Sequence, residues 1–363
     1  MRIFVTGATG FVGKALVERL VALGHDVGAV SRDPRSARER LGIHEVYSWD
    51  ELSKAFDSGF DAVVHLAGES VKGLWTQAKA DEVWNSRIWT SEALVEAITQ
   101  SSQRPGVLVS ASGIGFYGDA GEEELDEQSG AGDDYFARLC VEWEALILSA
   151  DLPDVRVACA RFGIVLGPGG GALALMVLPA KTGLSGPLGS GRQWWSWVSL
   201  EDAVSALVHM VQNSDVQGPV NVVAPQPIRQ SAFQKTLCAA LSRPSFIPTP
   251  AFGVRMLLGR FAEEVLASKR VKPTVLKNTR FEWADSELAA VFHRLLASNK
   301  TSLILPMLAA FALLAAPYGK TPHVIDEISM ALAGEGTLAG YAHAGFHCIA
   351  LPWFVAAAFF RSL

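Results

Sequence analysis

The amino-acid sequence predicts an α/β protein built on a doubly wound parallel sheet, with a smaller C-terminal region and an apolar helical tail. Three observations lead to this prediction. Short apolar runs alternate with stretches of helical periodicity over the first 160 residues, which is the pattern of βαβ units. A glycine-rich turn, Gly7-x-x-Gly10-x-x-Gly13, joins the first apolar run to the first helical stretch. After residue 300 charged residues become rare.

Five short apolar runs predict the strands of this sheet, because strands buried on both faces read as continuous hydrophobic segments. They cover residues 2–6, 26–30, 61–67, 107–110 and 155–160. Apolar residues at helical spacing predict a first helix from Gly13 to Leu23, and Gly24 is suited to its C-terminal end. A second, longer helix is predicted over residues 77–99.

The amino-acid composition of the chain changes after Gly167, and glycine and proline are frequent up to residue 191. Beyond this stretch, the sequence predicts two helices over 201–212 and 231–241, with a strand over 220–223 between them. We expect a first domain over residues 1–246, which includes interleaved segments at about 167–200 and 220–246, a second domain over 247–298, and an apolar helical hairpin over 299–363.

The composition excludes several classes of protein. The chain has 363 residues, of which 50% are hydrophobic and 19% charged, whereas disordered chains combine low hydrophobicity with high charge. A net charge of −6 is not that of a nucleic-acid-binding domain, which carries a basic surface. The four cysteines are scattered without metal-binding spacing, which is typical of a reducing compartment. We therefore expect a cytoplasmic protein with no metal site and no nucleic-acid partner.

The turn between the first strand and the first helix is suited to binding a dinucleotide. Gly7 permits the tight turn, Gly10 leaves room for a pyrophosphate to approach the backbone, and Gly13 allows the helix to pack closely on the sheet. A glycine-rich turn with only a structural role would carry the same residues. The strand and the helix that flank this turn favour nucleotide binding.

The residues after the second strand distinguish the two nicotinamide dinucleotides. An NAD site places Asp or Glu there, to bind the ribose 2′-hydroxyl. Here the strand is followed by Ser31 and Arg32, whose hydroxyl and guanidinium groups can bind a 2′-phosphate. We therefore predict NADP as the cofactor. NAD remains the alternative, with Asp33 in the acidic role.

The segment Thr6-Gly7-x-x-Gly10-x-x-Gly13 resembles the fingerprint of the extended short-chain dehydrogenase/reductase superfamily. Other segments are similar to one branch of it, the uncharacterised nucleoside-diphosphate-sugar epimerase-like family, whose members end in a short family-specific C-terminal domain. These segments are Leu66-Ala67-Gly68-Glu69, Asn85-Ser86-Arg87, Cys140-x-x-Trp143-Glu144, residues 186–191 and residues 247–293.

This resemblance implies an NAD(P)-binding Rossmann fold with a substrate-side region, a small-molecule substrate such as a sugar nucleotide, and a homodimer. It also implies which residues bind the cofactor. They are Thr6, Gly7, Gly10, Phe11, Val12, Gly13, Ser31, Arg32, Leu66, Ala67, Gly68, Glu82, Arg87 and Leu166. On this basis we expect an NADP-dependent, epimerase-like oxidoreductase.

The catalytic pair of the superfamily is missing from this sequence. Its members use Tyr-x-x-x-Lys, with the tyrosine as acid/base, and a serine that orients the carbonyl. Alignment on Glu144 places Phe136 at the tyrosine position and Cys140 at the lysine position, and Ser112 lies one residue from the serine position. The catalytic residues therefore stay unassigned. Two functions remain open: an oxidoreductase or epimerase with another acid/base, and an NADPH-binding regulator without turnover.

The tail contains two uncharged stretches, 301–319 and 336–360, and each is long enough to cross a bilayer, which requires about 20 mostly apolar residues. Basic residues flank their outer ends and the loop between them is net acidic, which fits a hairpin with both termini in the cytoplasm. The tail thus predicts attachment to the inner membrane through residues 302–360. The alternative is a pair of soluble helices that pack on the main domain or on a second copy.

Overall fold

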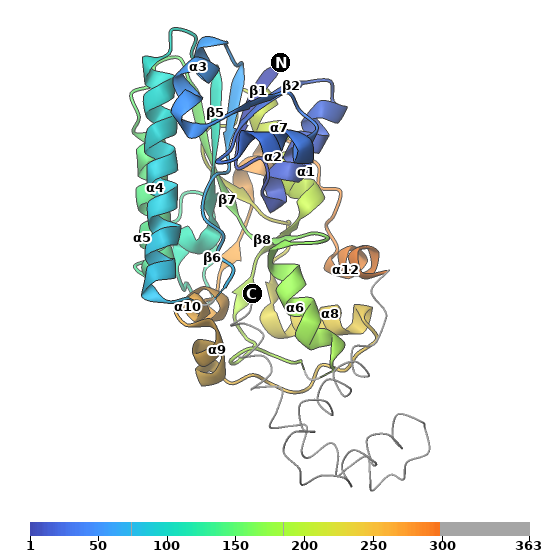
Figure 1. Cartoon of the computed structure of the whole chain (residues 1–363). Coiled ribbons are helices and arrows are strands. Elements are labelled where there is room, and N and C mark those ends of the chain that lie inside the picture. The colour runs from blue at the N-terminus through green and yellow to red at the C-terminus, as the bar shows by residue number, and fades with distance from the viewer. Residues whose placement is uncertain (74, 184, 298–363) are drawn as a thin grey trace, which may run out of the picture.

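The computed structural model describes residues 1–73, 75–183 and 185–297. Its centre is a seven-stranded sheet in the order β11-β7-β5-β4-β1-β2-β3, with parallel neighbours throughout (Figure 1). The strands are β1 (Arg2–Thr6), β2 (Asp26–Val30), β3 (Glu45–Tyr47), β4 (Ala62–His65), β5 (Val107–Gly113), β7 (Arg156–Phe162) and β11 (Gly218–Val222). The chain order runs outward in both directions from β1 and β4, so the predicted doubly wound sheet is confirmed.

Helices cover both faces of this sheet (Figure 1). One face carries α1 (Phe11–Ala22), α2 (Pro34–Leu41) and α7 (Leu200–Gln212). The other carries α3 (Leu52–Asp57), α4 (Gln77–Gln100) and α5 (Tyr135–Leu148). The molecule therefore has the three layers, helix on sheet on helix, that βαβ repeats produce.

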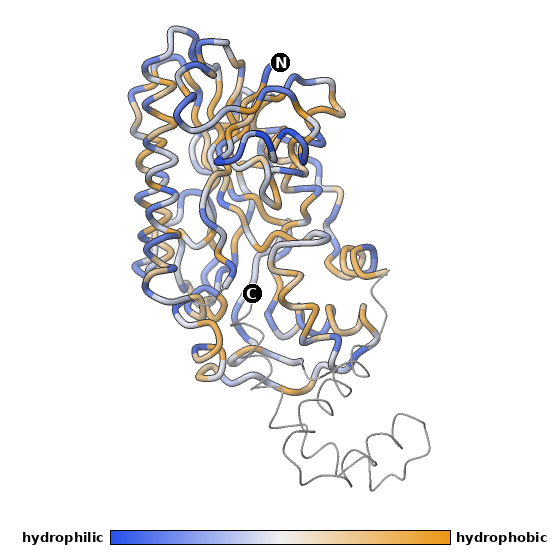
Figure 2. The backbone as a smooth tube through the Cα atoms, in the orientation of Figure 1, coloured by the Kyte–Doolittle hydropathy of each residue, from blue (hydrophilic) through white to orange (hydrophobic). Residues whose placement is uncertain are grey.

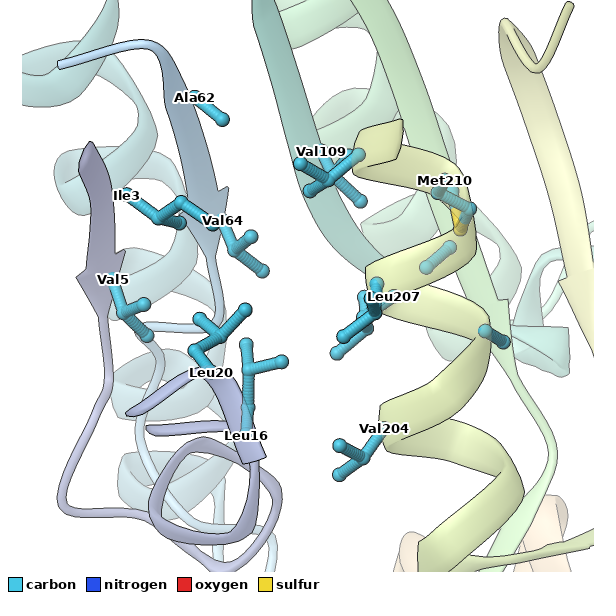
Figure 3. Packing of buried hydrophobic residues seen from close by; sticks show 14 of the residues in the cluster. Ile3, Val5, Leu16, Leu20, Ala62, Val64, Val109, Val204, Leu207 and Met210 are labelled. Atoms are coloured by element: carbon cyan, nitrogen blue, oxygen red, sulfur yellow. The ribbon is translucent and has the colours of Figure 1, made fainter. Parts of the chain in front are cut away.

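The packing on the first face follows from apolar residues at helical spacing. Leu16 and Leu20 of α1 are four residues apart, so they share one side of the helix, and they lie beside Val5 of β1 and Val64 of β4 (Figure 3). Leu207 of α7 belongs to the same cluster and faces them. These side chains are almost completely buried, so the cluster fixes the position of α1 relative to the end of β1.

The second face has an aromatic centre. Phe4 of β1 contacts Phe56 and Phe60, with ring centroids 5.2 and 5.0 Å apart, and Leu94 and Ile98 of α4 complete the cluster. Figure 2 shows that hydrophobic residues gather along the strands between the two helix layers. The core of the sheet domain therefore lies on both sides of β1 and β4.

A smaller lobe lies beyond the carboxyl ends of the strands (Figure 1). It contains β8 (Ile164–Leu166), α6 (Gly171–Lys181), β9 (Trp194–Trp195), β10 (Trp197–Ser199), β12 (Ile228–Arg229), α8 (Gln230–Ala240) and α12 (Leu288–Leu296). Phe233 lies at the centre of its core and contacts Trp195 and Phe292 edge to face, each at a centroid distance of 5.1 Å. Trp197 is buried in the same core.

The chain after residue 250 packs against both parts. It forms α9 (Ala251–Leu258), α10 (Phe261–Leu266), β13 (Arg270–Val271), α11 (Thr274–Asn278) and α12. β13 pairs in parallel with β6 (Glu124–Leu125), and Trp283 Nε1 donates to the carbonyl oxygen of Val223 at 3.0 Å. Phe261 of α10 stacks on Trp75, with ring centroids 5.4 Å apart. This segment thus reaches the loops at the carboxyl ends of the strands.

Several elements exceed the sequence predictions. The sequence does not predict the helices α2, α3 and α5 or the strand β3. In α2 the apolar periodicity is weak, because Ala37 is its one buried residue. β5 and β7 continue to Gly113 and Phe162, beyond the predicted ends at Ser110 and Ala160. Each strand keeps its parallel partner over the added residues, so pairing extends them.

The predicted apolar hairpin over 299–363 lies outside the described residues. Within residues 1–73, 75–183 and 185–297, no helix has the length and apolar character needed to span a membrane.

Candidate functional site

The carboxyl ends of β1, β4 and β5 and the loops after them form one edge of the sheet, which is where doubly wound proteins bind ligands. Thr6, the last residue of β1, connects β1 to the residues that follow β4. Its hydroxyl oxygen accepts hydrogen bonds from the backbone N–H groups of Leu66 and Ala67, both at 3.1 Å, and lies 2.7 Å from Nδ1 of His65. Three predicted cofactor residues, Thr6, Leu66 and Ala67, are therefore adjacent.

His65 is a structural member of this edge. Because the Thr6 oxygen already accepts two N–H groups, its proton is donated to Nδ1 of His65, and the His65 proton is assigned to Nε2, 3.1 Å from Ser91 Oγ on α4. Burial, with a smaller effect of the Arg87 charge, lowers the pKa of His65 to about 3. His65 is thus a neutral link between β1, β4 and α4.

The glycine turn follows β1 directly, and glycine is suited to its three positions for different physical reasons. Gly7 has a φ of 65°, in the left-handed region that favours glycine, and an added Cβ would lie 2.5 Å from the carbonyl oxygen of Leu66. An added Cβ at Gly13 would lie 2.2 Å from the carbonyl oxygen of Gly7, so Gly13 permits close packing of α1. Gly10 is the N-cap of α1 and has no side chain to bind the first amide groups of the helix.

The space at the N-terminus of α1 fits a pyrophosphate. Among the described residues, and apart from its chain neighbours, an added Cβ at Gly10 would meet only the carbonyl oxygen of Gly7 within 4 Å. The first amide groups of a helix have no intrahelical acceptor and attract anions, and the first turn of α1 has no acidic side chain. Arg40 of α2, which the sequence does not single out, also reaches this loop and donates to the carbonyl oxygen of Thr9 at 3.4 Å.

Ser31 and Asp33 follow β2 at the same edge and are joined to the start of α2. Ser31 Oγ accepts from the backbone N–H of Asp33 at 3.2 Å. The Asp33 carboxylate accepts from the backbone N–H of Ser36 at 3.0 Å and thereby caps α2. Asp33, the acidic residue of the NAD alternative, is therefore engaged in a helix cap.

Arg32 is exposed and lies near the loop that follows β4. The hydrogen bond from Lys79 is the main cause of the lowered pKa of Glu69, and the charge of Arg32 contributes to it. Lys79 Nζ lies 2.7 Å from Glu69 Oε1 and 3.3 Å from Glu82 Oε2. The predicted residues Arg32 and Glu82 therefore belong to one charged group around Glu69 and Lys79.

Arg87 of α4 covers Gly68. An added Cβ at Gly68 would lie 3.2 Å from Arg87 Cγ, and Arg87 Nη1 donates to the carbonyl oxygens of Glu69 and Val83 at 3.1 and 2.9 Å. These contacts hold the loop after β4 against α4, beside the glycine turn.

Three further predicted residues have side chains committed to packing. The Leu166 side chain is fully buried in the core of the smaller lobe. The Phe11 ring lies against the turn before α6, since an added Cβ at Gly170 would lie 2.5 Å from Phe11 Cδ2. Val12 packs on the cluster between α1 and the sheet. The fully buried Leu166 side chain is closed to a ligand, whereas the Phe11 and Val12 side chains are half-buried.

Ser112, near the end of β5, belongs to a buried polar network. Its hydroxyl donates to Glu144 Oε1 at 2.6 Å, and Arg161 of β7 donates to the same carboxylate through Nε and Nη2 at 2.8 and 2.7 Å. Arg161 Nη1 also donates to the Tyr117 hydroxyl at 3.0 Å, which in turn donates to Asn221 Oδ1 at 2.7 Å. Burial raises the pKa of Tyr117 to about 12. The network joins β5, α5, β7 and β11.

The sequence does not predict the pairing of Glu144 with Arg161. The two residues lie on different elements, and no periodic pattern relates a helix residue to a strand residue. The available signal is that Glu144 is followed directly by the apolar residues 145–148 and that Arg161 follows the apolar residues 157–160. Such charges are buried only when they are paired.

Phe136 and Cys140 lie one turn apart on α5 and face the loop after β5. An added Cβ at Gly115 would lie 3.2 Å from Phe136 Cβ and 3.7 Å from Cys140 Sγ. Burial raises the pKa of the Cys140 thiol to about 12, and the charge of Glu144 adds to this effect. A phenyl ring and a neutral thiol therefore occupy this part of α5.

Known protein families and relatives match almost all of the described chain. Residues 3–223 match the model of the NAD dependent epimerase/dehydratase family, and residues 249–295 match a domain of unknown function, DUF1731. The chain is 39% identical over 289 residues to the epimerase family protein SDR39U1 homolog, chloroplastic, of Arabidopsis thaliana, which covers 78% of this chain and 83% of the relative. It is 38% identical over 304 residues to the human epimerase family protein SDR39U1, which covers 82% and 100%.

Solved structures share the same fold. The crystal structure of human SDR39U1 (isoform 2) with NADPH has a TM-score of 0.74 and 37% identity, over 82% of this chain and 100% of that chain. The nucleoside-diphosphate sugar epimerase from Corynebacterium glutamicum has a TM-score of 0.66 and 30% identity, over 82% of this chain and 58% of that chain. This chain therefore belongs to the NAD dependent epimerase/dehydratase family, as a relative of the SDR39U1 proteins with a C-terminal DUF1731 domain.

Proposed function

We propose that this chain binds NADP(H) and is an epimerase-like oxidoreductase that acts on a sugar nucleotide or another small carbonyl or hydroxyl substrate. The observation that carries the proposal is the open N-terminus of α1, which Gly10 caps without a side chain. The human relative crystallised with NADPH supports this cofactor. When bound, NADP(H) donates or accepts a hydride.

In this proposal the dinucleotide lies along the carboxyl edge of the sheet. The amide groups after Gly10 bind the pyrophosphate. Ser31 and Arg32 bind the 2′-phosphate, and the exposure of Arg32 and the engagement of Asp33 in the α2 cap support NADP over NAD. Residues 66–68, covered by Arg87, border the rest of the cofactor.

The same proposal assigns roles along the chain. Residues 1–246 form the cofactor-binding domain, with substrate-side segments at about 167–200 and 220–246, and residues 247–298 complete the substrate side as the C-terminal domain. The contacts of α10 and β13 with Trp75 and β6 support this last role. The homodimer and the hairpin over 299–363 stay predictions.

A regulator that binds NADPH without turnover is the second candidate, and one observation favours it. Phe136 and Cys140 have no proton to exchange at neutral pH, and the Ser112 hydroxyl already donates to Glu144. The positions that align with the catalytic residues of the superfamily thus offer no acid/base. An enzyme with this site must take one from another part of the chain.

Two measurements separate the candidates: titration of NADPH followed by its fluorescence, and NADPH oxidation against a panel of carbonyl compounds. Binding with turnover of at least one carbonyl supports the oxidoreductase. Tight binding without turnover of any compound supports the regulator. A chain that does not bind NADPH contradicts both.

A glycine variant tests the site itself. Gly10→Val should abolish NADPH binding because its side chain fills the space at the N-terminus of α1. The chain should still fold because Gly10 has an ordinary φ of −75°. Gly130→Val is the matched control, since an added Cβ at Gly130 meets no atom of the described residues within 4 Å. Retained NADPH affinity in Gly10→Val would overturn the assignment.

A further inference from the structure

Two ionisable side chains from the C-terminal segment meet near the carboxyl end of β5. Glu264 lies on α10, and Lys269 directly precedes β13. Glu264 Oε2 and Lys269 Nζ are 2.8 Å apart, and the Lys269 side chain is 3% exposed, against 23% for Glu264. Lysine is buried this deeply only when it is paired, so the position of Lys269 depends on Glu264.

The pair lies beside the two α5 residues that align with the catalytic tyrosine and lysine of the superfamily. An added Cβ at Gly115 would lie 3.4 Å from Glu264 Oε2, in addition to its contacts with Phe136 and Cys140. Gly115 belongs to the short helix η2 (Ile114–Tyr117), which follows β5. The Glu264 carboxylate therefore reaches the part of the edge where α5 offers no acid/base.

The surrounding backbone holds both residues in place. The backbone N–H of Lys269 donates to the carbonyl oxygen of Trp194 at 2.9 Å, and the Lys269 carbonyl oxygen accepts from Ser196 Oγ at 2.9 Å. Trp195 Nε1 donates to the carbonyl oxygen of Val265 at 3.1 Å, next to Glu264. Groups held in this way are preorganised, as a functional site requires.

The pair has unused hydrogen-bonding capacity. An ammonium group has three donors, yet within the described residues no acceptor has hydrogen-bonding geometry to Lys269 Nζ, and no donor has it to Glu264 Oε2. Their 2.8 Å contact is an ion pair that lacks the angles of a hydrogen bond. The nearby Glu144 carboxylate, by contrast, is bonded to Ser112 and Arg161. Lys269 Nζ and Glu264 Oε2 are both buried, so the partly exposed Glu264 side chain is the member of the pair that a ligand can reach.

We propose that Glu264, positioned by Lys269, is the acid/base of this protein and binds the reacting oxygen of a hydroxyl or carbonyl substrate. The inference rests on the proposed function. Glu264, the more exposed member of the pair, binds the oxygen and takes the proton of a hydroxyl, and the buried Lys269 ammonium positions the Glu264 carboxylate through their ion pair. On oxidation of that hydroxyl, the O–H electron pair completes the C=O bond and the carbon-bound hydrogen leaves as a hydride to the oxidised dinucleotide. Carbonyl reduction is the reverse.

The first test is a crystal structure of the full chain with NADPH. In a productive complex the carbonyl carbon of the substrate lies at a near-attack distance from nicotinamide C4, and its oxygen lies within hydrogen-bonding distance of the Glu264 carboxylate. These two distances together limit the separation between C4 and this carboxylate. Nicotinamide C4 should therefore lie within roughly 7 Å of a Glu264 carboxylate oxygen. A larger distance would overturn the inference and leave the proposed function intact. A chain that does not bind NADPH would overturn the proposed function, and the inference with it.

The second test uses Glu264→Gln and Lys269→Met, which each remove one charge at similar size. NADPH affinity should stay within about twofold, whereas turnover of a carbonyl that the wild-type chain reduces should fall by about 10²- to 10⁴-fold. Glu263→Gln and Lys277→Met change exposed residues of the same segment and should keep wild-type turnover. Melting temperatures verify that all four variants fold. Wild-type turnover in both pair variants would contradict the inference.

Discussion

Single polar side chains organise the carboxyl edge of the sheet. Thr6 and His65 join β1 to the loop after β4 at the point where the β1–β4 backbone pairing ends. His65 also reaches α4 through Ser91. The position of the glycine turn relative to the loop after β4 therefore depends on hydrogen bonds within the protein, before any ligand binds.

His65 should make stability depend on pH. Its pKa is about 3 in the folded chain and ordinarily 6.5, so below pH 6.5 the unfolded chain binds a proton that the folded chain does not. Neutral His65 thus makes its full contribution to the free energy of unfolding above pH 6.5, and this contribution is lost as the pH falls toward 3. Between pH 6.5 and pH 5 the free energy of unfolding should fall by about 2 kcal/mol, measured by urea denaturation.

A variant isolates this effect from that of other titrating groups. His65→Asn keeps a polar side chain but does not titrate in this range, so its free energy of unfolding should fall less over the same pH interval. The difference between the two slopes belongs to His65. Equal slopes for the wild-type chain and the variant would contradict the prediction.

Arg32 should select between the two dinucleotides. Loss of a charge-assisted contact to the 2′-phosphate should weaken NADPH binding roughly tenfold or more in Arg32→Ala, with little change for NADH. Fluorescence titration with both dinucleotides measures this. Arg35→Ala is the control, because the Arg35 side chain lies at the start of α2 and is 90% exposed. An equal loss for NADPH and NADH would exclude 2′-phosphate recognition by Arg32.

Secondary-structure elements meet through buried charges as well as through apolar packing. The Glu144–Arg161 pair connects α5 to β7, and Ser112 brings β5 into the same network. Tyr117 and Asn221 extend it to β11. Because two hydrogen bonds link Arg161 to the Glu144 carboxylate, the pair fixes the orientation of α5 on the sheet as well as its position.

Breaking this pair should destabilise the fold. Arg161→Met leaves the Glu144 carboxylate buried without its partner and should lower the free energy of unfolding by about 3–5 kcal/mol. The double variant Arg161→Met/Glu144→Leu should recover part of this loss, because no unpaired charge remains. Arg229→Met, which removes an exposed pair with Glu122, should have a much smaller effect. Urea denaturation measures all three, and a small effect of Arg161→Met alone would contradict the prediction.

The whole molecule is arranged so that its C-terminal segment returns to the edge of the sheet. α10 contacts Trp75 and Phe136 through Phe261, and β13 extends β6. These contacts bring Glu264 and Lys269 to the loop after β5. The segment that matches DUF1731 therefore contributes directly to the candidate site.

The tail provides a prediction for the full chain. Its uncharged stretches predict that the full chain sediments with membranes at high speed without detergent, whereas a chain ending at Ser298 stays in the supernatant. Both chains should bind NADPH equally, because the candidate site lies within the described residues. A full chain that remains in the supernatant would contradict the hairpin and favour soluble packing helices.

The sequence by itself determines the features that depend on neighbouring residues. The glycine turn, the helix after it, the apolar strands and the residues after β2 each lie within a short segment, so spacing and periodicity reveal them. The resemblance to a known family also predicts the C-terminal domain, which spacing and periodicity do not reveal. Weakly periodic elements such as α2 are not found, because their stability comes from contacts with the rest of the fold.

Only the tertiary structure decides which distant side chains meet. Tyr117 and Asn221 are 104 residues apart in sequence, and Glu264 approaches Gly115 across a still longer stretch of chain. The structure also shows that the Phe11 ring packs against the turn before α6 and that Leu166 lies in the core of the smaller lobe, and the cofactor role that the resemblance implies for both stays a prediction. Local patterns carry no information on such contacts, because a side chain's neighbours in three dimensions are set by how whole elements pack. The acid/base proposed for this chain, Glu264 positioned by Lys269, is therefore visible only in the folded structure.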